Sequence, residues 1–128
     1  MKLIIATVAA VSLAGCALRP ADYADAASTA VAIADGASEA NPIVGVFGDD
    51  LAAPTSLLLT AGARYAIDTQ AAPENRETYH RNLSTVKLAA TCNNIGVFLG
   101  AEPVVLVLSA VTCGALYHYY STLEGTTE

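Results

Sequence analysis

The sequence predicts an all-α fold, arranged as a small up-and-down bundle of about four helices. Alanine, the strongest helix former, is abundant along the whole chain. Proline and clusters of polar residues divide the apolar segments into helical lengths. The β-prone run Val104–Leu108 lies inside a longer apolar segment, so no strand pattern competes with the helical one. A chain of 128 residues is long enough for one domain with one modest core.

The first predicted helix covers residues 22–40. Asp22 and Asp25 stand in its first turn, where the positive end of the helix dipole favours negative charge. Asn41–Pro42 should end this helix as a fixed break, because the residue before a proline is disfavoured in the α conformation.

A second helix is predicted over residues 51–67. Asp49–Asp50 is a suitable N-cap, and Pro54 is tolerated within the first turns of a helix. The polar stretch that follows, Asp68–Glu77, is predicted to be an exposed loop.

The last two helices, over residues 78–100 and 103–120, are predicted to form a tight antiparallel hairpin. Glu102–Pro103 separates them, and proline is favoured at the first position of a helix. The predicted helical domain therefore covers residues 22–120, and a polar tail over residues 121–128 follows it.

Cys92 and Cys113 lie at nearly equal distances along the chain from the turn of this hairpin. The two side chains should therefore stand at a similar height on facing helices, which predicts a disulfide. Small residues such as Ala89 and Gly114 would let the helices approach closely enough. Two unpaired buried thiols are the alternative.

The segment 103–120 also has the composition of a membrane span. It carries no charge when His118 is neutral, and it almost reaches the length of about 20 residues that a span needs. Its aromatic end, Tyr117–Tyr120, is typical of membrane interfaces. Two interpretations stay open: the last two helices enter the bilayer, or a soluble bundle lies against it.

The first sixteen residues have the parts of an export signal. Lys2 is followed by the short apolar run Leu3–Ser12 and then by Leu13-Ala14-Gly15-Cys16. This segment resembles a bacterial lipoprotein signal peptide that ends in a lipobox. The resemblance implies removal of residues 1–15 and a diacylglycerol on the Cys16 sulfur. Residues 16–21 then become a lipidated tether.

The same resemblance implies a location. A lipidated Cys16 would hold the protein in the bacterial cell envelope, facing the periplasm. Ala17, where an aspartate would retain such a protein in the inner membrane, slightly favours the outer membrane. The expected partners are membrane lipid, through Cys16 and the last two helices, and another envelope protein.

Composition and motifs argue against several other classes of protein. A net charge of −6 without a basic stripe excludes nucleic-acid binding. No nucleophile elbow and no glycine-rich phosphate loop are present. Glu77 and His80 have the spacing of half a di-iron site, but no second motif completes it. We therefore expect no catalytic residues, no metal and no cofactor.

One face of the first predicted helix carries the most distinctive polar pattern. Asp22, Asp25, Thr29 and Glu39 share this face, and Asp35 lies at its edge. Such a stripe would bind a cation or a partner, or would pair with basic residues of the later helices, Arg64 and Lys87. A stripe that merely faces solvent is the alternative, and burial of the carboxylates distinguishes the two.

A second resemblance rests on the same helix. Asp25 with Ser28-Thr29, followed by Gly36-Ala37 and Glu39-Xaa-Asn41-Pro42, resembles small uncharacterised bacterial and phage-encoded membrane proteins. The resemblance implies a multi-helix membrane protein without an assigned reaction.

These observations lead to two expectations of function. The first is a non-enzymatic, lipid-anchored envelope protein that binds or occupies the membrane, with a phage or prophage gene as one natural source. The alternative is a small integral membrane module that binds an ion or solute through the helix-one carboxylates. Carboxylates that converge on basic residues inside the bundle would support the alternative.

Overall fold

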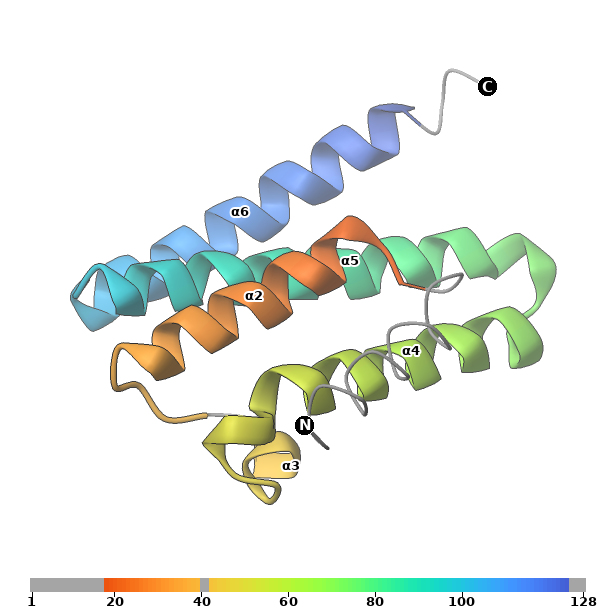
Figure 1. Cartoon of the computed structure of the whole chain (residues 1–128). Coiled ribbons are helices and arrows are strands. Elements are labelled where there is room, and N and C mark those ends of the chain that lie inside the picture. The colour runs from red at the N-terminus through yellow and green to blue at the C-terminus, as the bar shows by residue number, and fades with distance from the viewer. Residues whose placement is uncertain (1–17, 40–41, 125–128) are drawn as a thin grey trace.

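The computed structural model describes residues 18–39 and 42–124, and these residues form helices and their connections (Figure 1). The all-α prediction is confirmed, since no strand occurs in the described ranges. The elements in chain order are α2 (Pro20–Ala34), α3 (Pro42–Gly45), the 3-10 turn η1 (Asp49–Leu51), α4 (Ala52–Gln70), α5 (Pro73–Phe98) and α6 (Pro103–Glu124). The predicted signal peptide and Cys16 lie outside the described residues.

Helix α2 begins and ends earlier than the sequence predicted. Pro20 occupies its first turn, and the Asp22 carboxylate accepts a hydrogen bond from the Arg19 backbone N–H at 2.8 Å. The helix ends at Ala34 rather than at residue 40, because Gly36 takes a left-handed φ of 100° that stops it. Asn41 lies outside the described residues, and Pro42 opens the short helix α3.

The predicted loop Asp68–Glu77 is wrong. Helix α4 continues to Gln70 and α5 begins at Pro73, so only two residues connect them. Both connecting alanines have extended ψ angles, as expected for Ala72, which directly precedes Pro73. The polar side chains of this stretch lie on helices, with Glu74 in the first turn of α5.

Helix α6 opens at Pro103, as predicted, after Gly100 has ended the preceding segment with a φ of 69°. The helix runs on past Tyr120 to Glu124, so the first residues of the predicted polar tail are helical.

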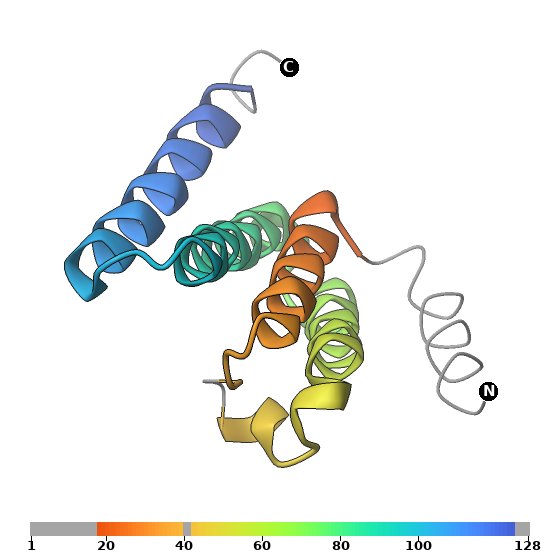
Figure 2. The same ribbon diagram turned by 60° about the vertical axis from the view of Figure 1, so that its left-hand side comes forward.

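The long helices are arranged around α5. Helix α5 contacts α2 and α4 on one side and α6 on another. Figure 2 shows α6 lying against α5 and set apart from α2 and α4. The predicted pair Cys92 and Cys113 joins α5 to α6 as a disulfide, with Cα atoms 6.5 Å apart. At Gly114 an added Cβ would lie 3.4 Å from the Ala89 Cβ, so the absence of a side chain there permits the close approach.

Candidate functional site

Arg64 of α4 lies at the centre of the bundle, and its side chain is fully buried. Its Nε contacts Asp22 Oδ2 at 2.6 Å and its Nη2 contacts Asp22 Oδ1 at 2.7 Å, so α2 and α4 share a two-point ion pair. The Asp22 side chain is fully buried as well. Such a pair holds two helices in one register because both hydrogen bonds depend on the same alignment.

The remaining donors of this guanidinium reach α5. Nη2 donates to Ser84 Oγ at 3.0 Å, and Nη1 lies 3.1 Å from His80 Nδ1. A guanidinium has donors only, so Nδ1 accepts and the His80 proton resides on Nε2. That nitrogen then donates to Asp68 Oδ1 at 2.7 Å, which links the buried group to the half-exposed Asp68.

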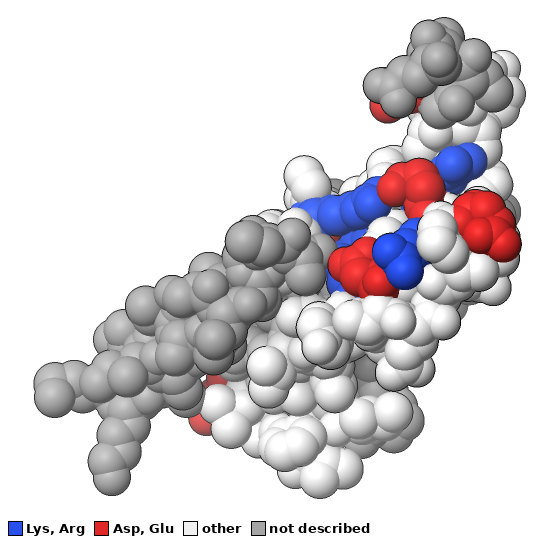
Figure 3. Space-filling model, turned by 90° about the vertical axis from the view of Figure 1, so that its right-hand side faces the viewer, with Lys and Arg blue, Asp and Glu red and all other residues white. Residues whose placement is uncertain are grey.

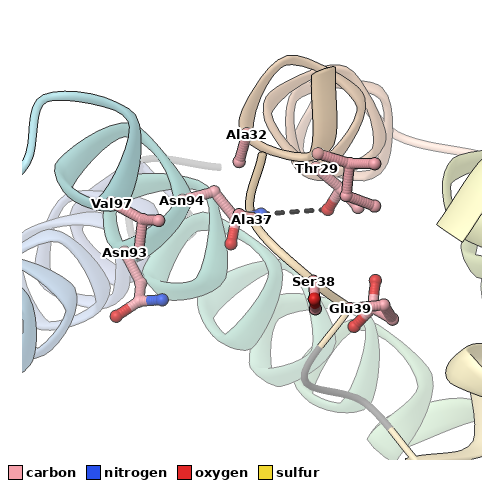
Figure 4. Close-up of a pocket in the computed structure, with 9 residues that line it drawn as sticks. Thr29, Ala32, Ala37, Ser38, Glu39, Asn93, Asn94 and Val97 are labelled. Atoms are coloured by element: carbon pink, nitrogen blue, oxygen red, sulfur yellow. Dashed lines mark hydrogen bonds between the residues drawn. The ribbon is translucent and has the colours of Figure 1, made fainter. Parts of the chain in front are cut away.

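A second group of polar side chains lies further along the same three helices. Lys87 Nζ contacts Asp25 Oδ2 at 2.8 Å and Ser56 Oγ at 3.0 Å. Beyond it, Asn94 Nδ2 donates to Ser28 Oγ at 3.2 Å and to Thr29 Oγ1 at 2.9 Å, as Figure 4 shows for Thr29.

These contacts form one continuous polar seam between α2, α4 and α5. We use the name polar seam for Asp22, Asp25, Ser28, Thr29, Ser56, Arg64, His80, Ser84, Lys87 and Asn94. Helical spacing explains it, since residues three, four and seven apart share a face and each helix turns a polar stripe inward. Within the described residues, no buried side-chain nitrogen or oxygen lacks a hydrogen-bond partner.

The structure brings together four of the predicted site residues. Asp25 and Thr29 pair with α5, while Arg64 and Lys87 supply the cations. A solvent-facing position is therefore wrong for Asp25, whose side chain is buried. Asp35 is instead the exposed C-cap residue of α2 and lies outside the seam.

Glu39 lies beyond the end of α2, beside a pocket of about 100 Å³. Ala37 and Ser38 approach from the same segment, and Asn93, Asn94 and Val97 close the pocket from α5 (Figure 4). The lining is a mixture of small apolar groups, amides and hydroxyls. The Asp49 carboxylate accepts a hydrogen bond through Oδ1 from the Glu39 backbone N–H at 3.0 Å, which ties η1 to this segment.

Six seam residues were absent from the predicted site: Asp22, Ser28, Ser56, His80, Ser84 and Asn94. Asp22 precedes Asp25 by three residues and was already expected on the same helix face. His80 and Ser84 stand one helical turn apart and precede Lys87, but only their approach to Arg64 gives them a role.

Charged side chains also gather at the end of the molecule where α4 meets α5 (Figure 3). Arg19 donates to both carboxylate oxygens of Glu77, at 2.9 and 2.8 Å. This hydrogen bond lowers the pKa of Glu77 below its ordinary value and raises the pKa of Arg19. Glu77 thus pairs with an arginine, and the described residues hold no group of three or more His, Cys, Asp or Glu side chains placed to bind a metal.

No protein-family model, curated protein or solved structure matches this chain.

Proposed function

We propose that this chain is a non-enzymatic protein of the bacterial cell envelope, anchored by lipid on Cys16, that acts by occupying the membrane. The proposal rests on the length, apolar composition and exposure of α6. This helix is long and apolar enough to cross a membrane, and only 6% of its most apolar 18-residue stretch is buried inside the protein.

The surface of α6 fits hydrocarbon better than water. Its large apolar side chains are exposed, among them Val104, Val105, Val107, Leu108, Val111 and Leu116. Exposed apolar patches of this extent are rare on soluble monomers and mark interaction surfaces. Tyr119 and Tyr120 are also exposed near its end, where aromatic rings favour the boundary between lipid and water.

Helix α5 is the partner of α6 in this proposal. We infer that the two form the tight antiparallel hairpin of a bundle whose four long helices run up and down, with the disulfide holding them together. A disulfide is stable in the periplasm and is rare in the cytosol, so it supports the envelope location. A periplasm-facing position with the outer membrane favoured, an envelope-protein partner and a phage or prophage source belong to the same proposal.

A membrane module that binds an ion or solute is the second candidate. The convergence of Asp22 and Asp25 on Arg64 and Lys87 inside the bundle favours it. Each carboxylate is already paired with a cation, however, so the seam offers an added ion no unneutralised charge. The pairs therefore support a packing role more directly than a binding role, and the first candidate is preferred.

Replacement of Cys16 tests the anchor. In cells with lipoprotein maturation, the wild-type chain should lose residues 1–15 and gain acyl mass, whereas Cys16→Ser should do neither. Intact-mass spectrometry of the membrane fraction measures both. The double variant Cys92→Ser/Cys113→Ser is the matched control, since it removes two cysteines and should leave lipidation unchanged.

Alkaline carbonate extraction tests the role of α6 separately. Cys16→Ser should remain in the pellet because α6 holds it in the bilayer. Release of Cys16→Ser with α6 intact would refute the membrane role of the helix. An unmodified Cys16 in the wild-type protein would refute the anchor.

A further inference from the structure

The bundle has an inverted distribution of polarity. Its buried side chains include Asp22, Asp25, Thr60, Arg64, His80, Ser84 and Thr91. The buried apolar side chains are four alanines and Val44, whereas more than twenty large apolar or aromatic side chains are exposed. A soluble domain normally buries its large apolar residues and keeps charge outside. The opposite pattern is expected where hydrocarbon surrounds the protein.

Exposed charge is confined to the two ends of the described bundle. One end carries Arg19, Asp68, Glu74, Arg76, Glu77 and Arg81, and Glu124 is the last residue of α6. The other end carries Asp35, Asp49, Asp50 and Glu102. Between these groups, the charged residues of α2, α4 and α5 all belong to the polar seam. A band of helical surface without charge therefore surrounds the seam.

This uncharged band has the height of a bilayer core. Residues 51–67 of the α4 region and residues 82–98 of α5 each rise by about 25 Å at 1.5 Å per residue, and α6 rises by about 30 Å. The hydrocarbon core of a bilayer is about 30 Å thick. Helix α2 is shorter, but Ala32 and Ile33 line a pocket together with Val97, so α2 and α5 end at the same level.

We propose that the acyl chains of a bilayer cover the uncharged band on all four long helices, so that the entire bundle is embedded. The proposal extends the proposed function, which requires only the lipid on Cys16 and the insertion of α6. The added prediction is that α2 and α4 also face lipid, through side chains such as Val31, Leu58 and Leu59, which are all exposed in the structure.

The polar seam makes such embedding physically consistent. Ionisable groups inside a membrane face the interior of a bundle and pair with one another, as Arg64 does with Asp22 and Lys87 with Asp25. The hydroxyl and amide groups of the seam likewise find partners on neighbouring helices. Hydrocarbon then meets mostly apolar side chains and tyrosines, with a few uncharged polar side chains such as Asn82 and Thr112.

Site-directed spin labels measure which surface faces lipid. The experiment uses the full-length lipidated protein in vesicles of phosphatidylethanolamine and phosphatidylglycerol, with single cysteines at Val31, Leu59, Val86 and Val111. Control cysteines replace Asp49 and Glu74 at the two ends. Cys92 and Cys113 stay paired and Cys16 stays acylated, so only the introduced thiol reacts.

At the four band positions, collisions with oxygen relative to a water-soluble nickel chelate should be several-fold more frequent than at the two controls. Nickel access at Val31 and Leu59 with lipid contact at Val111 would overturn the embedded bundle and leave the insertion of α6 intact. Nickel access at all six positions would overturn both. Protection from both reagents at Val31 and Leu59 would show a protein contact, such as a second copy, and would also overturn the proposal.

Thiol labelling from outside intact cells separates the failure of the anchor from the failure of the embedding. Lipid on Cys16 would place the nearby Arg19 end of the bundle at the periplasmic surface. By the positive-inside rule, the arginines at that end would instead place it at the cytoplasmic surface. A cysteine at Glu74 that reacts from outside supports the lipid anchor. Reaction only at the Asp49 position would refute the anchor, while the spin-label result would still decide the embedding.

Discussion

At the scale of single residues, Arg64 decides how the three helices of the seam fit together. Its donors contact Asp22 of α2 and both His80 and Ser84 of α5, and its side chain is fully buried. A buried ion pair adds little net stability over an apolar pair of equal size, but the loss of one partner leaves a charge without compensation. The pair therefore specifies the arrangement of the helices more than it stabilises them.

The substitution Asp22→Asn should destabilise the protein by about 3–5 kcal/mol, because it leaves the Arg64 charge buried without its counter-ion. Reversible denaturant unfolding in detergent micelles measures the change. The double variant Asp22→Leu/Arg64→Met should recover most of the loss, since it removes both charges. If Asp22→Asn unfolded at the wild-type denaturant concentration, the buried pair would be disproved.

The exposed pair of Arg19 and Glu77 should behave differently. The Arg19 hydrogen bond lowers the folded-state pKa of Glu77, so its stabilisation is present above the unfolded value of about 4.3 and is lost as the pH falls through the folded value. Glu77 is 65% exposed, so solvent screening limits the contribution to less than about 1 kcal/mol.

Arg19→Gln should raise the titration midpoint of Glu77 toward its ordinary value without a large change in stability. Carboxyl carbon NMR on protein with labelled glutamate measures the midpoint. Arg76→Gln is the matched control, since Arg76 bonds the Ala71 carbonyl instead. An unchanged midpoint in Arg19→Gln would show that the arginine does not set the pKa.

At the scale of elements, the approach of α5 and α6 depends on two glycines, Gly96 and Gly114. A Cβ added at Gly114 would lie 3.4 Å from the Ala89 Cβ, and the cysteine Cα distance of 6.5 Å is near the upper limit for a disulfide. A larger side chain at this position would have to separate the helices. In the chain-entropy model, closing this loop with the disulfide stabilises the folded protein by about 3 kcal/mol.

Gly114→Leu should therefore prevent closure of the disulfide and yield two thiols that can be alkylated. Mass spectrometry under non-reducing conditions counts them. Gly62→Ala is the matched control, because a Cβ at Gly62 of α4 meets nothing within 4 Å and alanine is the better helix former. A fully oxidised Gly114→Leu protein would show that the helices do not need this close contact.

At the scale of the whole molecule, the positions of charge predict where a new charge is tolerated. Leu59 is exposed near the middle of the uncharged band, whereas Asp50 belongs to one charged end. Leu59→Lys should cost about 2.5–3.5 kcal/mol in a bilayer, the insertion penalty of a lysine near a span centre. Asp50→Lys should be nearly neutral.

Recovery of each variant in the carbonate-resistant membrane fraction, together with its unfolding in vesicles, measures this difference. In water both substitutions would lie on an exposed surface and would have similar small effects. Equal stability of Leu59→Lys and Asp50→Lys in vesicles would therefore contradict the embedded bundle. The spin label at Val111 would then show whether α6 is inserted alone.

The sequence by itself determined the features that depend on neighbouring residues. Alanine content determines the all-α fold, Pro103 determines where α6 begins, and helical spacing places Asp25 and Thr29 on one face. The pairing of Cys92 with Cys113 also followed from the sequence, because a single turn separates their helices. The same local reasoning failed over Asp68–Glu77, where polar composition was interpreted as a loop although the residues lie on helix surfaces.

Only the tertiary structure decided which cation meets which carboxylate and which helix remains uncovered. Asp22 and Arg64 are 42 residues apart, and Asp25 and Lys87 are 62 apart. Contacts at such separations depend on the packing of whole helices, which no local propensity encodes. The same packing leaves α6 against α5 alone among the long helices in Figure 2, and that exposure is a property of the assembled bundle.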